Sequence, residues 1–256
     1  LKVAKGIGFV RTVTLDWLDL TAFLCLQQVD PEEMKVALEK AISETVHGVE
    51  ARRKTLNVLS AIWIKTEKTA PRLREEALSI LPTLSSPTER LWIHYGMTLV
   101  SYPIFRLLTA AIGQTGRMQE TITRKLAKEK MIAVYGDLGG LNRSVERMMA
   151  SLTDWGTLVK TKELSVYKIV YKQFSAAKPI QSWLLACALF AHPAEALAFN
   201  DLVWLPELYP FIFTVGIDDL LSDPHFEVQR QGGGLYMVRL QKAFVDKSSR
   251  KEQNQN

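Results

Sequence analysis

The feature that most constrains the fold is a change of hydrophobic period at Gly156. Before it, four apolar residues repeat at the spacing of one buried helical face: Val145, Met148, Met149 and Leu152. After it, residues 157–161 and 166–170 alternate polar and apolar side chains around a polar turn, which predicts two short strands. A chain that changes period in this way has to combine helices with a small sheet.

The residues before this change predict two helices joined by a glycine-rich turn. A helix is expected over 118–135, the turn over 136–140, and a second helix over Asn142 to Trp155. Helix, glycine turn, helix and hairpin, over residues 115–172, resemble the winged helix-turn-helix superfamily. The resemblance implies a fold that commonly binds duplex DNA, with the second helix as the recognition helix.

The whole chain is expected to be mainly α with short β-hairpins, an α+β class. An N-terminal all-helical domain is predicted over 1–113, where Asp30 caps a helix that starts at Pro31 and Tyr102-Pro103 marks a break. The winged-helix domain would follow over 114–174, and a C-terminal segment over 175–245. Residues 246–256 are polar and are predicted to be a disordered tail.

The C-terminal segment is compatible with a second, degenerate winged helix over 178–240. An apolar helix is expected over 178–191, and short helical pieces over 205–213 and 217–221. Gly232 to Gly234 then join two alternating stretches, which is a strong hairpin signal because glycine tolerates positive φ at the turn.

The positive charge of the protein is local. Residues 115–175 contain eleven basic and six acidic side chains, a net +5 that equals the net charge of all 256 residues. Everything outside this window therefore sums to zero. A basic excess confined to the winged-helix-like region is what phosphate contact requires.

The resemblance and the exposed positions together give a set of candidate DNA-binding residues. Asn142, Arg143, Ser144, Arg147 and Ser151 are expected on the outer face of the recognition helix. Lys160, Lys162 and Lys168 are expected to bring the hairpin to the DNA backbone, with Arg124, Lys125 and Lys128 adding charge from the preceding helix. Two other interpretations remain open: Asn142 serves as a helix N-cap, and the lysines are an ordinary solvated surface. Glu146 on the same outer face would repel phosphate.

No signature of an enzyme accompanies these features. The four histidines are scattered and no metal-ligand spacing occurs, so neither a metal nor another cofactor is expected. His94 is interpreted as a partly buried structural residue. Phosphate-binding glycine loops and the Gly-x-Ser-x-Gly elbow are also absent from the sequence.

Cellular context follows from cysteines and hydropathy. Cys25 and Cys187 lie far apart in apolar helical patterns, which favours two buried thiols in a reducing, cytoplasmic compartment. The longest apolar run, 183–191, is too short for a membrane span, so no membrane association is expected.

The sequence thus predicts a non-enzymatic protein that binds double-stranded DNA, as a regulator or a DNA-loading accessory subunit. The alternative is a protein-interaction scaffold, or a homodimer, built on winged-helix modules that bind no DNA. The aromatic stretch 203–211 would be its docking surface unless it is buried as core.

Overall fold

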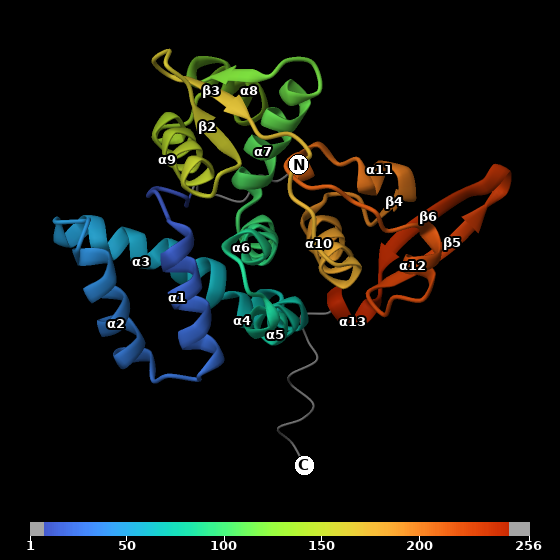
Figure 1. Cartoon of the computed structure of the whole chain (residues 1–256), viewed down its shortest axis with the longest axis horizontal. Coiled ribbons are helices and arrows are strands. Elements are labelled where there is room, and N and C mark those ends of the chain that lie inside the picture. Colours follow the sequence, from blue (N-terminus) through green and yellow to red (C-terminus); the bar gives the residue numbers. More distant parts are fainter. Residues whose placement is uncertain (1–7, 246–256) are drawn as a thin grey trace.

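The computed structural model describes residues 8–245, and the tail predicted over 246–256 lies outside the described residues. Helices predominate, and the strands form two antiparallel sheets of three strands each, so the predicted mainly α, α+β class is confirmed. One continuous hydrophobic core runs from Phe9 to Phe244. Figure 1 shows an N-terminal helical block beside two regions that each carry a sheet.

Side-chain caps stabilise the first turns of two helices in the N-terminal block. Asp30 accepts a hydrogen bond from the Glu32 N–H, with Pro31 as the first helical residue, and Ser86 and Glu89 form a capping box. The block comprises α1 (Leu15–Leu26), α2 (Pro31–Ser43), α3 (Val49–Trp63), α4 (Thr66–Thr69), α5 (Pro71–Ile80), the short 3-10 helix η1 (Leu81–Thr83) and α6 (Pro87–Ser101).

Helix α6 crosses the centre of the molecule. Its Tyr95 ring packs edge-on against Phe105, Trp155 and Phe211, which come from three later parts of the chain. At Gly96 the helix approaches α10 so closely that an added Cβ would lie 2.5 Å from the Trp183 ring. The N-terminal block and the two later regions therefore share one core.

The first helix–sheet unit, hereafter the first unit, spans residues 103–169. Its elements are α7 (Pro103–Gly116), β1 (Thr121–Thr123), α8 (Arg124–Tyr135), α9 (Leu141–Asp154), β2 (Leu158–Lys160) and β3 (Val166–Ile169). The sheet order is β1-β3-β2, with Thr121 opposite Lys168 and Leu158 opposite Ile169. Helix α7 continues through the predicted boundary at residue 113.

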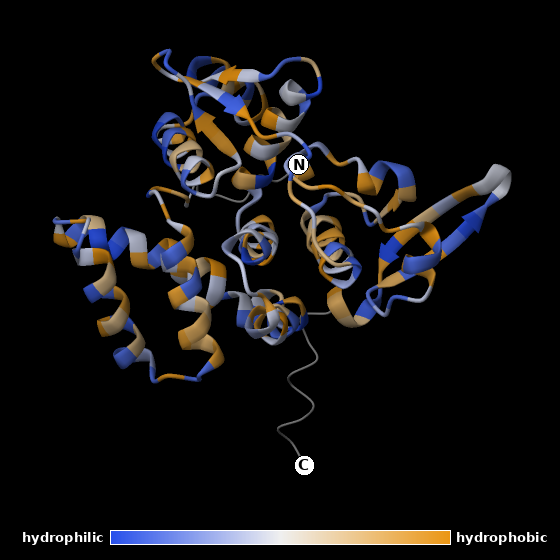
Figure 2. Ribbon diagram, viewed as in Figure 1, coloured by the Kyte–Doolittle hydropathy of each residue, from blue (hydrophilic) through white to orange (hydrophobic). Residues whose placement is uncertain are grey.

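The second helix–sheet unit, hereafter the second unit, spans residues 178–240. Its elements are α10 (Lys178–Ala191), β4 (Ala196–Ala198), α11 (Phe199–Val203), the 3-10 helix η2 (Pro206–Leu208), α12 (Ile217–Leu221), β5 (Phe226–Gln231), the glycine turn η3 (Gly232–Gly234) and β6 (Leu235–Leu240). The sheet order is β4-β6-β5, and α13 (Lys242–Val245) follows. The predicted hairpin is confirmed, and it projects from the molecule with a largely hydrophilic β5 (Figures 1 and 2).

Two predicted helices are wrong in part. The segment 118–135 begins as strand β1, because β-branched Thr121, Ile122 and Thr123 pair with β3; α8 begins only after Thr123, whose hydroxyl accepts a hydrogen bond from the Leu126 N–H. Of 205–213, only η2 is helical, since Phe211 instead bridges to Phe174.

The two units lock together where α7 meets η2. At Gly113 an added Cβ would lie 1.8 Å from the Pro206 carbonyl oxygen and 2.9 Å from Tyr209 Cβ, so only glycine fits. The Tyr209 hydroxyl reaches the Thr157 hydroxyl at 3.1 Å, and the Lys172 N–H donates to the Tyr209 carbonyl at 2.8 Å. Backbone and side chains of the second unit thus form part of the support of the first.

Candidate nucleic-acid interface

Helix α9 has the buried face that the sequence predicts. Gly140, with φ of 92°, reverses the chain before the helix, a conformation that glycine adopts without strain. Four predicted core residues are fully buried: Val145, Met148, Met149 and Leu152. Because Gly140 flanks the helix and Leu141 begins it, Asn142 is inside the first turn, and its interpretation as the N-cap is wrong.

Fewer residues of α9 face solvent than the sequence predicted. Asn142 and Arg143 are exposed and Arg147 is half-buried, whereas Ser144 and Ser151 are both 0% exposed. The prediction that these two serines face outward is wrong. The Ser151 hydroxyl accepts a hydrogen bond of 2.8 Å from the Val13 N–H, so the segment before α1 covers that side of the helix. Both serines are therefore removed from the candidate interface.

Glu146 lies within a group of cations. Lys128 Nζ of α8 lies 2.7 Å from Glu146 Oε1, and this hydrogen bond is the main cause that lowers the pKa of Glu146. The positive charges of Arg124 and Arg147 lower it further. The Glu146 carboxylate stays ionised, and its negative charge is offset by Lys128, Arg124 and Arg147. These four side chains together keep a net positive charge, so they do not repel phosphate.

The three residues of α8 predicted to contact DNA lie in different surroundings. Arg124 Nη2 donates to the Tyr167 hydroxyl at 3.0 Å, which ties α8 to β3 and raises the pKa of Arg124. Lys128 faces α9 as described. Lys125 is exposed and makes only a long ion pair of 3.9 Å with Glu129, one helical turn away.

The hairpin β2–β3 carries its three lysines on different sides. Lys160, Lys162 and Lys168 are all exposed. Lys168 pairs with Val159, on the face opposite to buried Tyr167, while Lys160 is in register with Tyr167 itself. One surface of the hairpin therefore cannot present all three lysines. Leu164 in the turn is 94% exposed.

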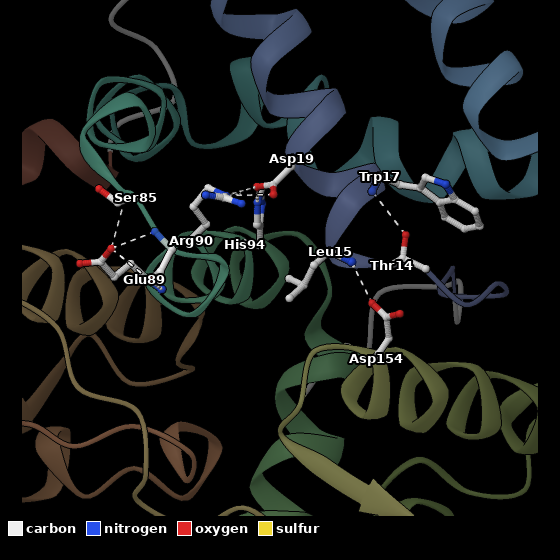
Figure 3. Close-up of polar contacts among 10 residues, drawn as sticks. Thr14, Leu15, Trp17, Asp19, Ser85, Glu89, Arg90, His94 and Asp154 are labelled. Carbon is white, nitrogen blue, oxygen red and sulfur yellow. Dashed lines mark hydrogen bonds and ion pairs between the residues drawn. The ribbon is translucent and has the colours of Figure 1, made fainter.

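The C-terminal end of α9 is joined to the N-terminal block by side-chain hydrogen bonds. The Leu15 N–H donates to Asp154 Oδ2 at 2.9 Å (Figure 3), and Trp155 Nε1–H donates to the Val13 carbonyl at 3.0 Å. Burial raises the pKa of Asp154. These contacts fix the orientation of α9 on the body of the protein.

A buried polar group behind this junction was not predicted. His94 Nε2 lies 2.7 Å from Asp19 Oδ1, and Arg90 Nε donates to the same carboxylate at 2.9 Å (Figure 3). Burial lowers the pKa of the fully enclosed His94 despite Asp19. Asp19, although burial opposes its ionisation, has a lowered pKa because of hydrogen bonds from His94 and Arg90. The group joins α1 to α6, and its Arg90 and Asp19 side chains are partly exposed whereas His94 is enclosed.

The aromatic stretch 203–211 is mostly core. Leu208, Tyr209 and Phe211 are buried, whereas Trp204 is 53% exposed, with Lys172 Nζ 3.1 Å from the centre of its ring. The Arg117 guanidinium donates to the Trp204 carbonyl. The stretch therefore presents a single aromatic side chain to solvent rather than an apolar surface.

No protein-family model, curated protein or solved structure matches the chain. Within residues 8–245, no group of three or more His, Cys, Asp or Glu side chains is arranged to hold a metal ion. In the same range no single helix has the length and apolar character to cross a membrane; α6 and α7 meet the test only jointly, across a bend of 119°.

Proposed function

We propose that the protein binds duplex DNA through the first unit, with α9 in the major groove and the hairpin β2–β3 on the sugar–phosphate backbone. The observation that carries the proposal is the arrangement of the unit: helix, strand, two helices and a hairpin, with the first strand beside the last. This is the arrangement expected of a winged helix-turn-helix, in which the helix that directly follows the turn contacts base edges.

The side chains of α9 support this orientation. Its exposed residues nearest the N-terminal end are Asn142 and Arg143, and Arg147 lies one turn further on. A guanidinium can contact a guanine edge with two hydrogen bonds, and an amide can do so with adenine. We assign base contact to Asn142, Arg143 and Arg147.

The backbone contacts are assigned to lysines and to one further arginine. Lys160, Lys162 and Lys168 of the hairpin, together with Lys125, are exposed, and Arg124 and Lys128 lie half-buried beside α9. Since the hairpin lysines occupy different sides, we expect Lys168 and Lys160 to contact different phosphates, or only one of them to contact DNA.

Fluorescence anisotropy with a labelled random-sequence duplex tests the proposal. Binding at about 50 mM salt should weaken steeply as salt rises, because lysine and arginine displace counterions. Arg143→Ala with Arg147→Ala should weaken binding by about tenfold or more. The matched control removes two exposed lysines from the N-terminal block, Lys40→Ala with Lys65→Ala, and should change affinity little.

Failure of the wild-type protein to bind any duplex at low salt would overturn the proposal. A folded protein of this kind would then be better explained as an interaction scaffold or a homodimer. Light scattering distinguishes these two, since a homodimer doubles the mass in solution and a scaffold without its partner remains a monomer.

A further inference from the structure

A cleft separates the helices of the N-terminal block, away from α9. It has a volume of about 890 Å³ and lies between α1, α2, α3 and α5. This volume is within the range of small-molecule binding sites. Figure 2 shows hydrophobic segments on both α1 and α2, the two neighbouring helices of this block.

The lining of the cleft is largely apolar. Met34, Leu38 and Leu78 form its buried part, and Leu56 is half-buried. Leu26 and Ile64 line it too, and they remain 37% and 36% exposed. Apolar surface left in contact with water is unfavourable, and an apolar occupant would remove it from water.

The charges around the cleft balance. Three basic and three acidic residues contribute to the lining: Lys35, Arg53, Arg74, Glu39, Glu67 and Glu75. All three cations are already engaged: Arg53 donates twice to Glu50 at 2.8 Å, Arg74 Nε donates to the Trp63 carbonyl, and Lys35 Nζ lies 3.7 Å from Glu32 Oε2. The cleft therefore offers no excess charge to a charged ligand, and an uncharged molecule fits it best.

Two polar side chains of α3 supply hydrogen-bonding capacity. Asn57 and Ser60 both line the cleft, three residues apart and hence on one side of the helix. Ser60 is half-buried and Asn57 is exposed at the mouth of the cleft, and within residues 8–245 neither side chain makes a hydrogen bond. An amide and a hydroxyl together can donate to and accept from one uncharged polar group.

We propose that this cleft binds a small, uncharged, mainly apolar molecule, whose polar group hydrogen-bonds to Asn57 and Ser60. The size, the apolar lining, the balanced charge and the two unengaged polar side chains all define the same class of ligand. The proposal does not depend on DNA binding by the first unit, and failure of one leaves the other intact.

The uncharged fluorophore N-phenyl-1-naphthylamine, which brightens in apolar surroundings, provides the test. The full-length protein should bind it saturably with one molecule per chain. Ser60→Trp places an indole in the cleft and should weaken binding by about tenfold or more. Leu221→Trp, at an exposed leucine of α12 outside the cleft, is the matched control and should bind as the wild type does.

Absence of saturable binding, or equal binding by the Ser60→Trp variant, overturns the proposal. If that variant fails to fold by circular dichroism, amide NMR shifts of the wild-type protein decide the matter. Shifts caused by the fluorophore should concentrate on residues of α1, α2, α3 and α5. Shifts concentrated elsewhere would place the fluorophore outside the cleft and refute the assignment.

Discussion

The two helix–sheet units have the same order of elements and differ in the surface they present. Both run helix, strand, helix, helix and hairpin, and in both sheets the third strand lies between the first and second. Residues 103–169 contain eleven basic and six acidic side chains, a net +5; residues 178–240 contain three basic and seven acidic ones, a net −4. Shared topology therefore does not entail a shared ligand.

The third helix of the unit also differs in length and in charge. In the first unit α9 has 14 residues and exposes Arg143, whereas α12 has 5 residues and carries Asp218 and Asp219 in its first turn. A helix of little more than one turn cannot follow a groove, and carboxylates at its start repel phosphate. The second unit instead supports α7 through η2.

The largest effect is expected from a substitution at the contact between α7 and η2. Gly113→Ala should destabilise the protein by about 3 kcal/mol or more, because the new methyl group collides with the Pro206 backbone and the two units must move apart. Urea unfolding measures the loss. Gly139→Ala is the control, since nothing lies within 4 Å of its added Cβ, and unchanged stability of the Gly113 variant would show that the units are not interlocked.

Charge reversal tests whether only one unit contacts DNA. If α9 contacts DNA as proposed, Arg143→Glu should lower affinity for a random duplex by about thirtyfold, because it replaces the proposed contact with a repulsion. Arg230→Glu makes the same charge change at an exposed position of β5 and should lower affinity by less than about threefold. Anisotropy titrations at one salt concentration give both values. Equal losses would mean that the second unit contacts DNA as well.

Raised pH should weaken the contact between the second unit and α5 of the N-terminal block. His225 lies 2.5 Å from both Asp223 and Glu76, and although burial opposes its charge, these carboxylates raise its pKa to about 9. Its folded pKa exceeds the ordinary value of 6.5. The stabilisation is therefore complete below about pH 6.5 and is lost as pH rises through about 9, roughly 1–3 kcal/mol in all.

Urea unfolding of the wild type and of His225→Gln, at about pH 7 and about pH 9.5, measures this effect. The wild-type protein should lose more stability than the variant. His47→Gln, at an exposed histidine between α2 and α3, should behave as the wild type does. A variant that keeps the full pH dependence would assign it to another group.

The smallest expected effect concerns Glu146 in the first unit. Glu146→Gln frees Lys128 from its ion pair, so DNA should bind about threefold more tightly, with a salt dependence steeper by about one counterion. Glu32→Gln, which alters an exposed ion pair with Lys35 in the N-terminal block, is the control. Weaker binding by Glu146→Gln would show instead that the carboxylate is needed to orient Arg124 and Arg147.

Local pattern was sufficient to predict the elements whose partners lie close in sequence. The buried face of α9 follows from helical spacing, and both hairpins follow from alternation around a polar or glycine turn. Strands β1 and β4 were missed because three residues show no period and their partners, such as Lys168 for Thr121, lie far along the chain.

The errors at the candidate interface have the same origin. Ser151 looks exposed on an isolated helix, but its cover comes from Val13, 138 positions away. Likewise, the partner of His94 is Asp19, 75 positions away, and no spacing rule connects them. Sequence periodicity gives the face of a helix that packs on its neighbours and does not reveal a distant segment that crosses its other side.

The fit around Gly113 also limits how this protein can change over evolution. Tandem modules joined by a free linker can be exchanged, lost or duplicated one at a time. Here the backbone of η2 occupies the space that a side chain on α7 would need. Replacing either unit with an unrelated domain would require changes in the surface of the other. We therefore expect the two units to be inherited together.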